Sequence, residues 1–278
     1  MTDITRNTVV DATVNILKEA ETTLPDDVVY ALKSAEQNES SPVAKSQISA
    51  ILQNIDIARK QKIPMCQDTG ILIFYVEVGR NLELDFDIKD AIEEGVRYAT
   101  ERIPLRPNAV DPITRKNSSN NVGPGLPDIK YELVEENKLT ITAAPKGAGS
   151  ENMSELRMFN PTETNNIKKF AVETVLNAGG KPCPPIILGI GIGGSFDKAP
   201  RLAKSALLDN INKMDEFEKN ILDDINSLGI GPMGIGGDTT ALSVKVKTSY
   251  CHTASLPVAV NIQCWANRHA SITLDGDK

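Results

Sequence analysis

Aromatic side chains are scarce in this sequence: they make up 4% of the 278 residues, with a single tryptophan. The core of a chain this long must therefore consist mainly of Ile, Leu, Val and Ala. Long apolar runs are also missing, since none approaches the roughly 20 residues of a membrane-spanning helix. The polar start at residues 1–4 lacks the apolar segment of a signal peptide. We therefore expect a cytoplasmic globular protein with no membrane partner.

Excess positive charge is absent as well. The chain has 30 Lys and Arg against 37 Asp and Glu, which gives a formal net charge of −7 at pH 7. Nucleic acids and anionic membranes bind surfaces that are rich in Lys and Arg, so this balance argues against both as partners. An anionic substrate would need a local Arg or Lys to offset the overall field.

Cysteine is rare and never paired in a CxxC motif, which leaves a zinc ribbon without support. Four cysteines in a cytosolic chain of this length indicate metal or catalytic use rather than a disulfide scaffold. Cys66, Cys183 and Cys264 each follow or precede a predicted element, and Cys251 is the candidate spare. Iron–sulfur clusters usually take four cysteines, and three would leave one iron open to substrate. The alternative is that these cysteines are small apolar core residues.

The apolar pattern predicts a single domain over residues 1–278, of the α+β class, with a helical N-terminal part and a mixed α/β core with small β-sheets. The first 60 residues are predicted to be helical, with helices that begin near Asp26 and Pro42. The remaining predictions are strands at 71–78, 186–192, 239–248 and 256–262, a hairpin of 129–134 with 139–144, and helices at 87–103, from Pro161 to Gly179, and near 197–210 and 214–228.

The most informative stretch is Pro-Met-Cys-Gln-Asp-Thr-Gly at 64–70, between the helical region and a β-prone run. Scaffolds often place chemistry at such junctions. Our hypothesis is that Cys66 binds an iron–sulfur cluster and that Gln67 and Asp68 face the substrate beside it. Arg106 follows in a Pro-Leu-Arg-Pro segment, where the prolines restrict the backbone and so aim the arginine.

Other segments allow more than one interpretation. The run Gly-Ile-Gly-Ile-Gly-Gly at 189–194 matches GxGxxG, but the second strand with its acidic residue does not follow at the required distance, so close approach of a bulky group is favoured over a dinucleotide. The segment 146–150 fits a tight turn or an anion-binding nest. The polar stretch 111–127 is longer than most connections and fits a lid, a binding loop or a linker. A turn between two strands would bring His252 near Cys264, although a lone histidine is more often structural.

Taken together, several segments resemble the iron–sulfur (class I) fumarate hydratase and L(+)-tartrate dehydratase family, specifically its α subunit. They follow one order along most of the chain: 64–70, 104–108, 111–117, 145–152, 183–194, 234–242, 252–257 and 263–270. The resemblance implies the fold of the iron-dependent fumarate hydratase N-terminal domain.

The resemblance also implies roles for individual residues. It implies that Cys66, Cys183 and Cys264 bind a 4Fe–4S cluster. It implies substrate-binding roles for Gln67, Asp68, Arg106 and Gly149. It also implies that Asp68 and His252 are catalytic and act around the departing hydroxyl. The family pattern often has Lys-Gly-Gly-Gly where this chain has Ala148, which weakens the case for backbone roles in that loop.

Single-chain members of the family continue into a second domain, so the resemblance implies a β-subunit partner, a heterotetramer and inactivity of this chain alone. The implied reaction is the reversible hydration of fumarate to (S)-malate, with the cluster as Lewis acid. L(+)-tartrate or mesaconate is the alternative small dicarboxylate. From other classes, an NAD-dependent oxidoreductase and a non-catalytic iron–sulfur protein stay open.

Overall fold

The structure, a computed structural model, describes residues 4–276, so the ends of the predicted 1–278 domain lie outside the described residues. The chain forms two compact units. Unit 1 takes the chain up to Pro25, Ile55–Gly147 and the chain from Arg268, and unit 2 takes Asp26–Asn54 and Ala148–Asn267. Whether the units act together as one catalytic domain stays a prediction.

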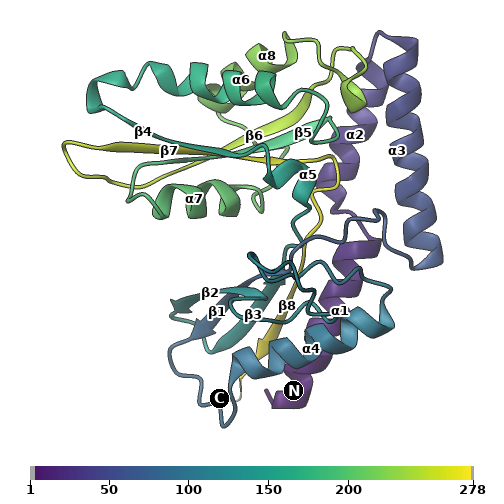
Figure 1. The fold of residues 1–278 in the computed structure, drawn as a ribbon, viewed down its shortest axis with the longest axis vertical. Helices are drawn as coiled ribbons and strands as arrows, with labels where there is room; N and C mark the ends of the chain where they lie inside the picture. Colours follow the sequence, from purple (N-terminus) through teal and green to yellow (C-terminus); the bar gives the residue numbers. More distant parts are fainter. Residues whose placement is uncertain (1–3, 277–278) are drawn as a thin grey trace. The chain divides into compact units, whose positions relative to one another are not determined.

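Unit 1 is a four-stranded sheet with two helices on one face (Figure 1). Its elements are α1 (Arg6–Thr22), the last turns of α3 (Pro42–Gln61), β1 (Ile73–Gly79), α4 (Ile88–Arg102), β2 (Asp128–Val134), β3 (Lys138–Ala143) and β8 (Ala270–Asp275). The strand order is β2-β1-β3-β8, with β1 parallel to β2 and antiparallel to β3.

The predicted hairpin of 129–134 with 139–144 is therefore wrong, because β1 lies between these two strands. The physical reason is burial. β1 is largely buried and needs partners on both sides, whereas β2 has no fully buried residue and suits an edge of the sheet.

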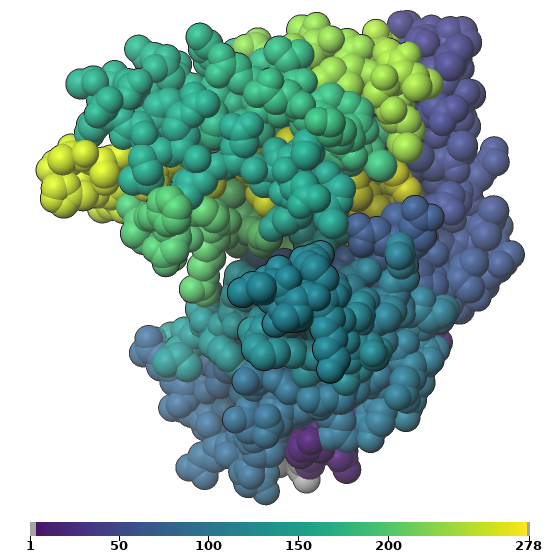
Figure 2. Space-filling model, in the orientation of Figure 1, coloured from purple at the N-terminus to yellow at the C-terminus, as the bar shows by residue number. Residues whose placement is uncertain are grey.

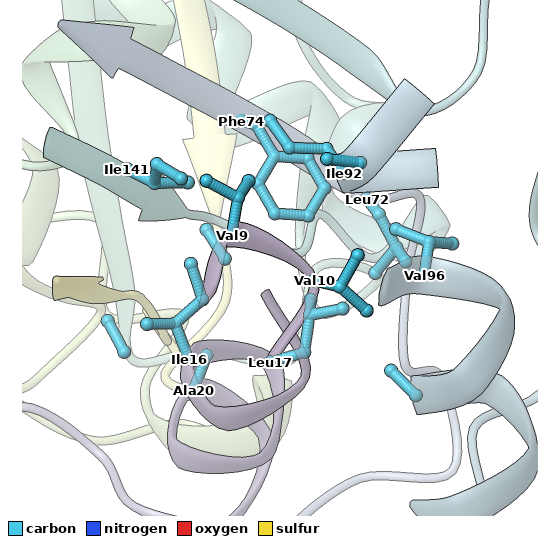
Figure 3. Packing of buried hydrophobic residues seen from close by; sticks show 14 of the residues in the cluster. Val9, Val10, Ile16, Leu17, Ala20, Leu72, Phe74, Ile92, Val96 and Ile141 are labelled. Carbon is cyan, nitrogen blue, oxygen red and sulfur yellow. The ribbon is translucent and has the colours of Figure 1, made fainter. Parts of the chain in front are cut away.

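The core of unit 1 joins both helices to the sheet. Figure 3 shows Val9 and Val10 of α1 and Ile92 and Val96 of α4 around Phe74 of β1, and all five side chains are buried. The apolar stripe of α4 was predicted from its helical spacing, and the structure confirms this helix.

Unit 2 is a second four-stranded sheet, in the order β4-β7-β5-β6. Its elements are α2 (Asp26–Asn38), the first turns of α3, α5 (Ala148–Glu151), β4 (Glu155–Phe159), η1 (Pro161–Glu163), α6 (Asn166–Ala178), β5 (Ile186–Ile192), α7 (Lys198–Ala206), α8 (Glu216–Asn226), η2 (Pro232–Gly234), β6 (Ala241–Thr248) and β7 (Leu256–Gln263). Helices α6 and α8 cover one face of this sheet and α7 covers the other (Figure 1).

Two glycines of the GxGxxG run lie inside β5 and face α7. A Cβ added at Gly189 or Gly191 would lie 2.0 Å from the backbone oxygen of Ala203 or Ala199, respectively. Glycine is therefore required for α7 to pack against the strand, and the bulky neighbour expected from the sequence is a helix. The first two glycines of the motif are not available to a dinucleotide.

Two mixed sheets with helices packed on them confirm the predicted α+β class. Within 4–276, no helix is both long and apolar enough to cross a membrane.

Candidate active site

The loop that carries Cys66, Gln67 and Asp68 lies in unit 1, between the end of α3 and the start of β1. One oxygen of the Asp68 carboxylate, Oδ1, accepts a hydrogen bond from the backbone N–H of Gly70 at 3.0 Å and so stabilises the turn. The next residue, Ile71, exchanges two backbone hydrogen bonds of 2.9 Å with Lys146. The local backbone therefore fixes the direction in which the loop enters the sheet.

The Arg106 segment contacts the same loop. The backbone N–H of Arg106 donates to Thr69 Oγ1 at 3.1 Å, and the side chain of Asn108 donates to the Gly70 carbonyl at 3.0 Å. Gln67 and Arg106 are exposed and Asp68 is half-buried. The structure thus brings three predicted substrate-binding residues into one region of unit 1, where a guanidinium can bind a carboxylate through two nitrogens.

The long segment 111–127 is ordered against this region through Asn121, which is 5% exposed. Its Oδ1 accepts from the backbone N–H of Asn108 at 2.7 Å, and its Nδ2 donates to the Arg106 carbonyl at 3.0 Å. The segment therefore supports the arginine. Whether it also acts as a lid or a binding loop stays a prediction.

A buried ion pair lies behind the loop. Arg268 Nη1 is 3.1 Å from Glu21 Oε2, and Arg268 Nη2 donates to the Asp68 carbonyl oxygen. Burial raises the pKa of Glu21 to about 7, the nearby Arg268 charge lowers it, and the Asp68 charge raises it. Sequence reasoning missed both residues. The one available signal was the position of Arg268 within the 263–270 motif.

Cys183 and Cys264 lie together in unit 2. The start of β5 pairs with the end of β7 through Ile187 and Gln263, and the backbone N–H of Trp265 donates to the Cys183 carbonyl at 3.5 Å. Covalent geometry then limits the Cα–Cα distance between the two cysteines to roughly 8 Å. Two residues that are far apart in the sequence therefore meet at one end of the sheet.

Each of these two cysteines has a distinctive environment. Cys183 is exposed and has a φ of +56°, which is uncommon for a residue with a side chain and is often found at functional sites. Cys264 is half-buried, and the side-chain amide of the buried Gln263 donates to its sulfur at 3.7 Å. Amide donors of this kind tune the electronic properties of metal-bound sulfur.

Gly149 lies in the same part of unit 2, on the short helix α5. A Cβ at this position would be 3.5 Å from the Lys181 carbonyl oxygen, two residues before Cys183. The turn at 229–237 supports the same segment, because the Met233 N–H donates to the Pro184 carbonyl at 2.8 Å. The structure thus groups Gly149 with the cysteine pair.

His252 lies at the opposite end of β7 from Cys264. It belongs to the exposed connection 249–255 between β6 and β7, which projects as the yellow tip of unit 2 (Figure 2). Its Nδ1 accepts from the backbone N–H of Ala254 at 3.0 Å. The eight residues of β7 separate His252 and Cys264 by about 25 Å, so the turn does not bring them together. Cys251 occupies the same connection and is exposed.

Comparison with known proteins gives consistent results. The model of the family described as fumarate hydratase (Fumerase) matches residues 10–273. A Methanocaldococcus jannaschii protein with the provisional name L(+)-tartrate dehydratase subunit alpha is 49% identical, over 94% of this chain and 95% of its own length. The Escherichia coli L(+)-tartrate dehydratase subunit alpha is 29% identical, over 98% of this chain and 92% of its own.

A third relative is longer. A Geobacillus stearothermophilus protein with the provisional name fumarate hydratase class I is 34% identical over 94% of this chain, and the match spans 54% of the relative. The chain thus covers about half of that protein and nearly all of the two named as alpha subunits.

Proposed function

Because the chain belongs to the fumarate hydratase (Fumerase) family, we propose that it is the cluster-binding α subunit of a hydro-lyase that acts on a four-carbon dicarboxylate. The observation that carries the proposal is the pairing of Cys183 and Cys264 at one end of the unit 2 sheet. Core cysteines have no reason to meet at a strained, exposed backbone position, whereas cluster ligands do.

The donor set fits a 4Fe–4S cluster with one open iron. Cys66, Cys183 and Cys264 supply three thiolates, each of which would bind a different iron.

Both groups of proposed residues lie near positions at which the chain passes from one unit to the other. The chain leaves unit 1 at Gly147, beside Asp68, and Gly149 follows two residues later beside the Cys183 segment. Similarly, only four positions along the chain separate Cys264 from Arg268, which donates to the Asp68 carbonyl.

Removal of water from a dicarboxylate such as malate requires loss of a proton α to a carboxylate and departure of hydroxide. A cluster with an open iron supplies a Lewis acid for the departing oxygen when it is bound. In our proposal, Arg106 grips a substrate carboxylate, Gln67 orients the substrate, and Asp68 holds a proton near the departing oxygen.

The position of His252 limits which active site it can serve. With about 25 Å of strand between it and Cys264, His252 cannot act on a substrate held at the cysteine pair of its own chain. We therefore propose that His252 serves the site of a second copy of this chain, which agrees with the proposed heterotetramer.

We propose fumarate and (S)-malate as the first substrate pair. The names of two relatives favour L(+)-tartrate as the second, with mesaconate as a further analogue. The same names support a β subunit as partner, which would supply further cationic residues and the base for the carbon-bound proton. The longer relative supports this division, since this chain spans about half of it.

The test is activity of the anaerobically purified chain, alone and with a co-expressed β subunit, on fumarate, L(+)-tartrate and mesaconate. We expect hydro-lyase activity only with the partner, and loss of activity in air. Arg106→Lys should lose much of its substrate affinity or turnover, whereas Arg59→Lys, at an exposed position on α3, should match the wild type. Wild-type kinetics in Arg106→Lys would remove this arginine from the site.

A further inference from the structure

Two charged residues that sequence reasoning overlooked are almost completely removed from water in unit 1. Glu21 is 0% exposed at the end of α1, and Arg268 is 3% exposed just before β8. A buried ion pair is weak evidence for stability, because an apolar pair of the same volume often stabilises the folded state as much. We therefore looked to the contacts of the pair for a functional role.

The guanidinium of Arg268 contacts two partners. Nη1 faces the Glu21 carboxylate at 3.1 Å, while Nη2 donates to the main-chain carbonyl of Asp68. Glu21 also holds the same loop through its own main chain, because its carbonyl accepts from the Met65 N–H at 2.9 Å. The two residues thus fasten the loop at Met65 and at Asp68, on either side of Cys66 and Gln67.

The Asp68 side chain is confined as well. A Cβ built on Gly147 would lie 3.0 Å from Asp68 Oδ2 and 3.9 Å from Arg268 Nη2. The carboxylate therefore packs against the backbone of Gly147, while Oδ1 accepts from the Gly70 N–H. With its carbonyl held by Arg268, Asp68 has little freedom to turn.

We propose that Arg268 and Glu21 are positioning residues, which fix the main chain at Asp68 and thereby aim its carboxylate at the substrate. This inference rests on the proposed function, since it gives Asp68 a catalytic role. A guanidinium presents separate nitrogens to the Asp68 carbonyl oxygen and to the Glu21 carboxylate, whereas a lysine ammonium has a single nitrogen. A displacement of about 1 Å at a reacting group is enough for a hundredfold loss of rate.

The test uses Arg268→Met and Arg268→Lys in the complete enzyme with its β subunit. Iron and sulfide content are measured first, so that only cluster-loaded enzyme is compared. We expect Arg268→Met to lose about a hundredfold in kcat with KM within about twofold. Arg268→Lys keeps the charge and should recover part of that loss. If Arg268→Met does not fold, kcat and KM of Arg268→Lys test the proposal instead. We then expect kcat to fall about tenfold.

The chain offers a matched control in unit 2. Lys245 and Glu218 form another buried pair, with side chains 9% and 6% exposed and an N–O distance of 2.9 Å. Lys245→Met should also lower the unfolding temperature, while its kcat stays at the wild-type value.

The outcomes separate this inference from the function beneath it. Wild-type kcat in cluster-loaded Arg268→Lys, or a kcat loss in Lys245→Met equal to that in Arg268→Met, would overturn the positioning role. Absence of hydro-lyase activity in the cluster-loaded wild-type complex would instead overturn the proposed function.

Discussion

Gly70 closes the Cys66–Gly70 loop at a φ of +75°, a conformation that favours glycine. An added Cβ would lie 2.7 Å from the backbone N and C atoms of Lys146 and 2.8 Å from its oxygen. Those backbone atoms are held in place by the hydrogen bonds between Ile71 and Lys146, so they cannot move aside cheaply. Gly70→Ala should therefore disturb the loop that carries Cys66 and Asp68.

The structure provides a control for the conformational part of this cost. Gly125, also in unit 1, has a φ of +76°, and an added Cβ there would meet nothing within 4 Å. Both alanine variants incur about 1–2 kcal/mol for the left-handed conformation, offset by about 0.4–1 kcal/mol from the less flexible unfolded chain. Gly70→Ala adds a steric cost of about 1–3 kcal/mol. We expect it to be about 2 kcal/mol less stable than Gly125→Ala.

Urea unfolding of each variant, followed by circular dichroism, measures this difference, and the two midpoints are comparable because both glycines lie in unit 1. Fluorescence of Trp265 is unsuitable because this residue belongs to unit 2. Equal midpoints for the two variants would refute the argument that Lys146 packs against the loop as described. We also expect Gly70→Ala to lose activity in the complete enzyme and Gly125→Ala to retain it.

Two further predictions concern stability. In the cluster-free chain, Cys183→Gly should be about 1 kcal/mol more stable than Cys183→Ala, because glycine relieves the positive φ but is more flexible when unfolded. Urea midpoints of the two variants check this, and a more stable alanine variant would argue against backbone strain at position 183. The second concerns Glu21, whose pKa rises from 4.5 to about 7 on folding. Its contribution is fully present below about pH 4.5 and is lost as pH rises through 7, by about 3 kcal/mol in all. Unfolding curves between pH 5 and 8 should show this decline in the wild type and a flatter one in Glu21→Gln, and parallel curves would contradict it.

Local sequence predicted most of the elements. The helix predicted at 87–103 forms as α4, whose N-terminus is capped by the Asp87 carboxylate. The strand predicted at 186–192 forms over the same residues because β5 is apolar and short between prolines and glycines. By contrast, β4 and β8 were not predicted. They are edge strands with partly exposed residues, and such strands carry a weak hydrophobic signal.

Pairing and burial were harder to foresee. The short connection after β2 favours a hairpin with β3, and only the need of β1 for two neighbours overrides it. Glu21 stands at the end of an ordinary amphipathic helix, where a carboxylate is normally solvated. Its burial depends on Arg268, which lies at the other end of the sequence, and no local pattern reports that contact.

In the candidate site too, local neighbours could be predicted and long-range contacts could not. Residues within one motif, such as Gln67 and Asp68, stay together because the chain holds them, and the Thr69–Arg106 hydrogen bond adds the arginine. His252 and Cys264 are separated by the strand that was itself predicted, so the length of that strand already argued against their proximity. Strand length was therefore the overlooked signal.

The central claim is that Cys66, Cys183 and Cys264 hold one 4Fe–4S cluster, and iron and acid-labile sulfide per chain test it most directly. Four single Cys→Ala variants, reconstituted anaerobically, should be compared with the wild type. We expect about four irons in the wild type and in Cys251→Ala, and loss of the intact cluster in the other three variants. A full complement of iron and sulfide in Cys66→Ala, Cys183→Ala or Cys264→Ala, or its loss in Cys251→Ala, would contradict the account.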